Sequence, residues 1–231
     1  MGGRFMDKYY LILVLPAFVL ALFSQYKVKS TFKKYSRSSN SRNMTGAQVA
    51  RMILDRNGLY DVNVEPIAGN LTDHYDPRTK IVRLSDGVYN STSLAAIGVA
   101  AHETGHAIQH AVHYSPLGLR SGLVPVANIG SSLGPYLAVF GLIFQMPLLF
   151  NIGIILFTGA VAFYLITLPV EFNASRRAIN ILQGEYILSD NEMSPVKKVL
   201  SAAAMTYVAS AAVAMANLLR LILLSRGRSR D

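Results

Sequence analysis

The sequence predicts a mainly α-helical membrane protein in which about four transmembrane helices accompany one small α/β domain. Of its 231 residues, 52% are hydrophobic and only 15% are charged, a composition typical of membrane proteins. The apolar residues gather in four long runs, whereas residues 27–115 have the mixed polarity of a small soluble domain. The chain contains no cysteine, so disulfides and thiolate metal sites are excluded.

The first apolar run, Tyr9 to Phe23, predicts an uncleaved membrane anchor. Basic residues follow this run instead of preceding it, and no small-residue cleavage pattern comes after it, unlike in a secretory signal peptide. The net charge is +9, and most Lys and Arg flank apolar runs, where anionic headgroups and insertion account for them. We therefore expect a lipid bilayer as a partner, and no nucleic acid.

The polar stretch after the anchor predicts a small α/β unit. Residues 36–43 have the composition of a linker. Thr45 is a suitable N-cap for a helix that ends at Asn57-Gly58. Residues 62–67 have strand character. Two further short segments predict a hairpin about Asp76-Pro77-Arg78-Thr79, namely residues 71–75 and 80–84.

A second helix is expected from Ser91 or Ser93 to about His113, with one polar face. His102 and His106 are four residues apart, so their imidazoles converge from one face on one ion, as two zinc ligands do. Glu103 then lies beside the metal, where it can take a proton from the bound water and later deliver one to the leaving amine. The segment His102-Glu103-Thr104-Gly105-His106 therefore predicts a zinc-dependent hydrolase.

A catalytic zinc normally has three protein ligands and one open position. His110 lies about 12 Å from His102 along the helix axis, so one ion is not expected to bind His102, His106 and His110 together. A metzincin would place a glycine and a third histidine where this chain has Gln109 and Val112. Glu171 follows two more apolar runs, which return the chain to the side it left, and is the expected third ligand.

Three further apolar segments, residues 121–144, 148–170 and 202–224, are each long enough to cross a bilayer core of about 30 Å. Basic residues between 27 and 42 outnumber those before the anchor, so the positive-inside rule puts the catalytic domain on the cytoplasmic side. The basic tail would then lie outside, unless the last segment does not fully cross. The resulting division is a 1–26 anchor, a 27–116 α/β metalloprotease domain, a 117–170 transmembrane hairpin, a 171–199 third-ligand segment and loop, and a 200–231 C-terminal helix and tail.

The motifs carry a family resemblance. The segment His-Glu-Thr-Gly-His-Ala-Ile-Gln-His at 102–110, followed by Glu-Phe-Asn-Ala-Ser-Arg-Arg-Ala at 171–178, resembles the YugP-type family of bacterial membrane zinc metallopeptidases over nearly the whole chain. It is similar, more distantly, to HtpX-type membrane proteases of the gluzincin class. HtpX-type sequences often have an Asp four residues after the ligand Glu, where this chain has Ser175, so support of the ligands must differ in detail.

This resemblance implies a zincin-like catalytic domain in a multi-pass protein of the bacterial cell membrane. It implies one Zn2+ ion per chain, held by His102, His106 and Glu171, with Glu103 as the catalytic acid and base. The implied substrate is a protein or peptide. The sequence sets neither the substrate's identity nor the oligomeric state.

Five more residues are candidates for supporting the ligands or binding substrate: His74, Tyr75, His110, Asn173 and Ser175. His74 and Tyr75 lie on a predicted strand, which can pair with an extended substrate, and either side chain can help an oxyanion. A surface histidine and an amphipathic tyrosine explain these two residues equally well. His110 and His113 are interpreted as supporting or solvent-facing residues.

Three alternative functions remain open from the sequence. An intramembrane site-2-type protease would carry an Asp-Gly pair in a membrane segment, whereas Asp86-Gly87 lies in a polar stretch. The other two are a non-proteolytic zinc-binding membrane scaffold and a metal-independent interaction protein. Both predict that function survives the loss of Glu103.

Overall fold

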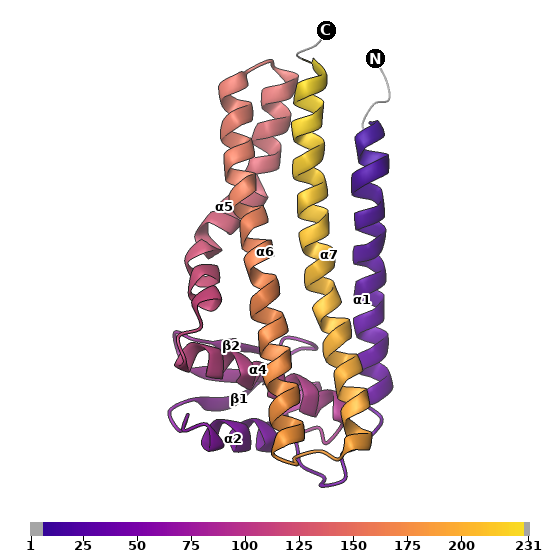
Figure 1. Ribbon diagram of the computed structural model, residues 1–231, viewed down its shortest axis with the longest axis vertical. Coiled ribbons are helices and arrows are strands. Elements are labelled where there is room, and N and C mark those ends of the chain that lie inside the picture. The colour runs from indigo at the N-terminus through magenta and orange to yellow at the C-terminus, as the bar shows by residue number, and fades with distance from the viewer. Residues whose placement is uncertain (1–6, 229–231) are drawn as a thin grey trace. The chain divides into compact units, whose positions relative to one another are not determined.

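The computed structural model describes residues 7–228, and their contacts divide them into two units (Figure 1). Residues 7–25, 119–168 and 206–228 form the first unit, here called the membrane bundle. Residues 26–118 and 169–205 form the second, here called the α/β unit. Four long helices continue from one unit into the other, so the chain passes between the units several times.

The membrane bundle is built from parts of four long helices. They are α1 (Leu15–Tyr35), which follows the π-helical turn η1 (Tyr10–Val14), α5 (Ser115–Ile143), α6 (Pro147–Gly184) and α7 (Asp190–Arg228). Within the described residues, these four are long and apolar enough to cross a membrane. The prediction of about four membrane-spanning helices is confirmed as far as helix length and composition are concerned. Helices α6 and α7 extend well beyond their predicted apolar runs, because their polar ends continue as helix inside the α/β unit.

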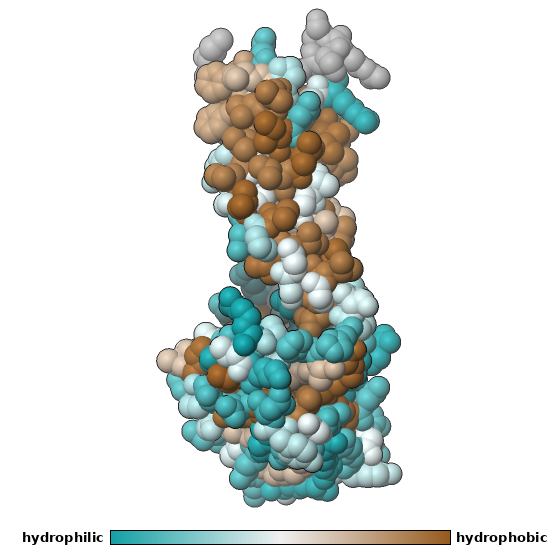
Figure 2. All heavy atoms as spheres, turned by 90° about the vertical axis from the view of Figure 1, so that its left-hand side faces the viewer, coloured by the Kyte–Doolittle hydropathy of each residue, from teal (hydrophilic) through white to brown (hydrophobic). Residues whose placement is uncertain are grey.

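Close backbone contacts hold the bundle together. A Cβ atom on Gly134 of α5 would lie 2.9 Å from the Phe157 nitrogen of α6, so small residues let these helices approach, as in other membrane proteins. Asp7 accepts hydrogen bonds from the Arg220 guanidinium of α7 at 2.7 and 2.8 Å. Large apolar side chains such as Leu148 and Ile155 remain exposed, and the visible surface of the bundle is mostly hydrophobic (Figure 2).

The α/β unit contains a three-stranded sheet of β1 (Asn63–Ile67), β2 (His74–Asp76) and β3 (Ile81–Ser85), in the order β1-β3-β2. Strands β2 and β3 are antiparallel and form the predicted hairpin, with Tyr75 opposite Val82. Strand β1 pairs in parallel with β3, which the sequence analysis did not predict. Strand β2 is therefore an edge strand, with one side unpaired within the described sheet.

Three shorter helices complete this unit: α2 (Gly46–Arg56), α3 (Asp86–Tyr89) and α4 (Leu94–Ala111). The N-cap predicted at Thr45 is present, and it is part of a capping box in which Thr45 and Gln48 each bond the backbone of the other. The segment predicted as a linker is instead pinned to the domain: buried Asn40 donates to the carbonyls of Met44 at 2.8 Å and Thr92 at 2.6 Å. The bond to Thr92 holds this segment beside the start of α4.

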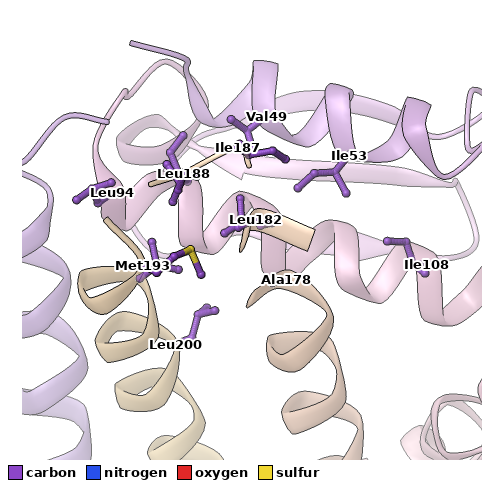
Figure 3. Close-up of a cluster of buried hydrophobic side chains, with 13 residues drawn as sticks. Val49, Ile53, Leu94, Ile108, Ala178, Leu182, Ile187, Leu188, Met193 and Leu200 are labelled. Carbon is purple, nitrogen blue, oxygen red and sulfur yellow. The ribbon is translucent and has the colours of Figure 1, made fainter. Parts of the chain in front are cut away.

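Helix α4 lies between two hydrophobic clusters. One contains Ile97 and Ala101 and joins α4 to α2 and to the ends of α6 and α7 in the α/β unit (Figure 3). The other contains Ala96 and Ala100 and joins the neighbouring face of α4 to α2, α3 and the sheet. Because two neighbouring faces of α4 pack into hydrophobic clusters, the helix is held firmly, and side chains on its remaining polar face keep fixed positions.

Candidate metal centre

Helix α4 presents the His-Glu-x-x-His segment from the middle of the α/β unit. The Ser93 side chain caps the helix by accepting a hydrogen bond from the Ala96 nitrogen at 3.2 Å. His102, Glu103 and His106 lie two to three turns further on, where Glu103 and His106 are 8% exposed. The predicted helix is thus present, between Leu94 and Ala111.

Gly105 allows α6 to approach this segment. A Cβ atom at Gly105 would lie 2.8 Å from the Ala174 carbonyl oxygen and 3.2 Å from the Ala174 Cα, closer than a real side chain tolerates. The backbone of α6 therefore rests directly on α4 at this glycine. Because Glu171 precedes Ala174 by one turn of α6, this contact brings its carboxylate to the polar face of α4.

Three potential ligands converge on one point. The Glu171 Oε2 atom lies 3.2 Å from the His102 Nε2 and 3.5 Å from the His106 Nε2. The two imidazole rings stand edge to face, with centroids 4.8 Å apart. Among the described residues, these three form the group of side chains whose ligand atoms all lie within 4.8 Å of one another. The Glu171 side chain is 2% exposed.

The geometry and chemistry of this group fit zinc. In a tetrahedral site with ligand distances of about 2.0–2.1 Å, two ligand atoms are separated by about 3.3–3.4 Å. The separations of 3.2 and 3.5 Å from Glu171 to the two imidazoles agree with this spacing. Two imidazoles and one carboxylate are also a ligand set that catalytic zinc sites use.

Burial and charge shape the electrostatics of the centre. Burial raises the pKa of the Glu103 carboxyl, and the neighbouring imidazoles of His102 and His106 oppose that rise only in part. Burial lowers the pKa of the His106 imidazole, but the neighbouring Glu171 carboxylate and the negative charge of Glu103 outweigh burial and raise it.

Both imidazoles also have a partner at Nδ1, the nitrogen that faces away from Glu171. The Ser175 Oγ lies 3.1 Å from the His102 Nδ1, and the Gln109 Oε1 lies 3.0 Å from the His106 Nδ1. The Gln109 Nε2 donates to the Asn173 Oδ1 at 3.0 Å. Ser175 thus contacts His102 directly, and Asn173 is connected to His106 only through Gln109.

His74 and His110 are not members of the three-residue group. The Tyr75 hydroxyl is 2.8 Å from the His110 Nδ1, and burial, with the charges of Asp61 and Asp76, raises the pKa of Tyr75 to about 12. The His74 Nδ1 lies 2.8 Å from the carbonyl of nearby Thr72. His113 is exposed just after the end of α4.

The sequence analysis missed two residues that shape the centre. Gln109 belongs to the predicted polar face of the helix but was given no role at the centre, although its position three residues after His106 was a usable signal. Asp73 accepts hydrogen bonds from the Ser85 nitrogen at 2.7 Å and the Ser85 hydroxyl at 3.0 Å, which ties the start of β2 to β3. Its carboxylate also adds to the rise in the Glu103 pKa.

Comparison with known proteins agrees with this chemistry. Residues 10–226 match the model of a protein family described as "Putative neutral zinc metallopeptidase". The chain belongs to this zinc metallopeptidase family. It is also 51% identical over 215 residues to the "Putative membrane protease YugP" of Bacillus subtilis (strain 168), covering 93% of this chain and 96% of that protein. No solved structure matches the chain.

Family membership confirms the resemblance drawn from the 102–110 and 171–178 segments. A membrane protease family implies a peptide substrate, and the four apolar helices imply a lipid partner. The metallopeptidase family and the three-residue group together indicate zinc as the metal.

Proposed function

We propose that this chain is a membrane-embedded zinc endopeptidase in which His102, His106 and Glu171 hold one Zn2+ ion and Glu103 transfers the protons. The observation that carries the proposal is the convergence of two imidazole Nε2 atoms on one carboxylate oxygen, at 3.2 and 3.5 Å. Glu103 follows the first imidazole directly in the sequence, on a rigidly packed helix. The zinc metallopeptidase family supports the same activity independently.

The proposed mechanism assigns each step to a residue of the chain. Zinc, when bound, supplies Lewis acidity, which polarises the substrate carbonyl and makes a water molecule more acidic. The Glu103 carboxylate takes a proton from the attacking water as the new C–O bond forms. It then gives that proton to the amide nitrogen as the C–N bond breaks, and is itself regenerated. Burial raises the pKa of Glu103 in the direction that suits a group which both accepts and donates.

We propose that the substrate chain docks along β2. This strand is at the edge of the sheet and contacts α4 through the pair of Tyr75 and His110, 2.8 Å apart. An extended peptide can add to such an edge through backbone hydrogen bonds. Because its pKa is raised to about 12, Tyr75 keeps its proton at neutral pH and can donate a hydrogen bond to a developing oxyanion.

We also propose the protease class of this enzyme and the side of the membrane on which its catalytic domain lies. A helix with two histidine ligands, a second helix with a glutamate ligand and an adjacent edge strand are the parts of a zincin-like domain of gluzincin type. The basic residues between 27 and 42 favour a cytoplasmic position for this domain. Asp86-Gly87, the pair relevant to a site-2-type protease, begins the short helix α3 of the α/β unit, which does not favour that alternative.

Replacement of Glu103 by Gln tests the mechanism. The amide keeps the size of the side chain but cannot accept the proton, so cleavage of an unfolded protein substrate by purified protein should fall at least about 100-fold. Zinc content should stay at that of the wild type, because Glu103 is not a proposed ligand. The matched control is Glu65→Gln on β1, at the opposite edge of the sheet from β2.

Unchanged cleavage by Glu103→Gln would contradict the mechanism. Full zinc content without cleavage in the wild type, over a panel of unfolded substrates and the chain itself, would favour the non-proteolytic scaffold.

A further inference from the structure

The Gln109 side chain makes three hydrogen bonds beside the metal centre. Its side chain is completely buried. The amide oxygen Oε1 lies 3.0 Å from the His106 Nδ1. The amide nitrogen Nε2 donates to the Val170 carbonyl at 2.8 Å and to the Asn173 Oδ1 at 3.0 Å. Gln109 therefore contacts a proposed ligand on α4 and the residues on both sides of Glu171 on α6.

Two groups that cannot change their hydrogen-bonding role fix the orientation of this amide. The Val170 carbonyl can only accept, so the nitrogen of Gln109 must face it. The Arg177 Nε can only donate and does so to the Asn173 Oδ1 at 2.8 Å, so that oxygen must also accept from Gln109. Either constraint alone places the Gln109 oxygen toward His106.

The orientation of Gln109 in turn sets the tautomer of His106. An amide oxygen can only accept a hydrogen bond, so the His106 Nδ1 must carry the proton. In a neutral imidazole, Nε2 is then unprotonated, and its lone pair points toward the Glu171 carboxylate. His102 has no such constraint from Ser175, because a hydroxyl can either donate or accept.

We propose that Gln109 is a positioning residue for the zinc centre, whose amide fixes His106 in the tautomer that binds metal through Nε2. Gln109 also joins the ligand on α4 to the segment of α6 that carries Glu171, because its nitrogen bonds to Val170 and Asn173. The inference rests on the proposed zinc centre and adds a residue, Gln109, that orients the His106 ligand in the metal-free protein. Outer partners of this kind change metal affinity by about 10–100-fold.

Two substitutions test the roles of the Gln109 amide oxygen and amide nitrogen separately. Gln109→Met keeps the length of the side chain and removes all three hydrogen bonds, so zinc affinity should fall about 10–100-fold. Gln109→Glu keeps an oxygen facing His106, so zinc affinity should stay within about threefold of wild type, although the melting temperature of the zinc-free protein should fall. The matched control is Gln183→Met, at an exposed position later on α6.

The measurement is zinc affinity, by chelator competition on the full chain in detergent, with the melting temperature of each zinc-free variant recorded. A purely structural role would lower the melting temperature of Gln109→Met without changing its zinc affinity. Zinc binding by Gln109→Met as tight as by Gln183→Met would overturn the inference while leaving the proposed function in place. Equal losses of affinity in Gln109→Met and Gln109→Glu would also overturn it.

A measurement without any change at Gln109 covers the case in which Gln109→Met does not fold. Protein with 15N-labelled histidine, with His74, His110 and His113 replaced by Gln, is loaded with 113Cd2+ and studied by NMR. One-bond coupling of cadmium to the His106 Nε2, with a proton on Nδ1, is the expected result. Coupling to the His106 Nδ1 would overturn the inference. A chain that binds neither zinc nor cadmium would overturn the proposed centre itself, and this role with it.

Discussion

Gly105, the fourth residue of the His-Glu-x-x-His segment, has no side chain because the backbone of α6 occupies the space where one would lie. The nearest atom to a Cβ there would be the Ala174 carbonyl oxygen, at 2.8 Å. Side chains can change rotamer to relieve such a contact, but a helix backbone can only move as a whole. The position of Glu171 relative to the two imidazoles therefore depends on the smallest residue in the segment.

Gly105→Ala should accordingly push α6 away from α4. We expect a loss of about 1–3 kcal/mol in stability and a weaker zinc affinity, because Glu171 would be displaced from the histidines. Thermal unfolding and chelator competition measure the two effects. Gly118→Ala is the control, since a Cβ at Gly118 meets nothing within 4 Å. Equal behaviour of the two variants would contradict the role assigned to this contact.

At the scale of elements, local sequence predicted the helices and the hairpin well, but not the pairings between distant segments. The starts of α2 and α4 were predictable from Thr45 and Ser93, because N-capping is a local interaction. The parallel pairing of β1 with β3 depends on a crossover past β2, which no local pattern encodes. The α6 helix was predicted to end near Val170, because the apolar run ends there, yet it continues to Gly184 by packing within the α/β unit.

The same limit applies to the candidate site. The spacing of His102 and His106 follows from helical geometry, and the double crossing after α4 suggested Glu171. The contact between Gly105 and Ala174, and the bonds of Gln109 to Val170 and Asn173, join residues more than 60 positions apart. Such contacts emerge only from the packing of two helices against each other.

At the scale of elements, the ion pair between Asp7 and Arg220 links the residues just before η1 to α7. Both side chains are largely buried, at 18% and 21% exposure. Replacing Arg220 by Leu should cost more than the ~1 kcal/mol of an exposed pair and less than the ~3–5 kcal/mol of a fully buried one. The exchange variant Asp7→Arg with Arg220→Asp should recover part of that loss.

Thermal unfolding of the full chain in detergent provides the measurement for this pair. The control is Arg56→Leu, which removes an ion pair to Glu185 of the α/β unit that is more exposed, at 44% and 31%. A melting temperature for Arg220→Leu no lower than that of Arg56→Leu would argue against a stabilising role for the pair.

At the scale of the whole molecule, the sequence left two topologies open, because the last apolar segment either crosses the membrane fully or does not. The length and composition of α7 favour a full crossing. Helix α7 is continuous from Asp190 to Arg228 and contains a window apolar enough to cross a membrane. The contact of Arg220 with Asp7 also brings the later part of α7 to the start of the first apolar helix. We therefore propose four full crossings, which would make the basic tail an exception to the positive-inside rule.

The absence of cysteine makes this orientation easy to test with single-cysteine variants. In spheroplasts, Ser38→Cys, in the loop after α1, should be labelled by a membrane-impermeant maleimide only after lysis. Met146→Cys, in the exposed loop between α5 and α6, should be labelled before lysis. The reverse pattern would place the α/β unit outside the cell.

The most direct test of the proposed centre is the zinc content of purified protein, measured per chain by elemental analysis. Wild type should hold about one zinc ion. Glu171→Ala should lose it, because Glu171 faces both imidazoles at 3.2 and 3.5 Å. His110→Ala should keep it, because His110 bonds Tyr75 instead. Full zinc in Glu171→Ala together with its loss in His110→Ala would contradict the account.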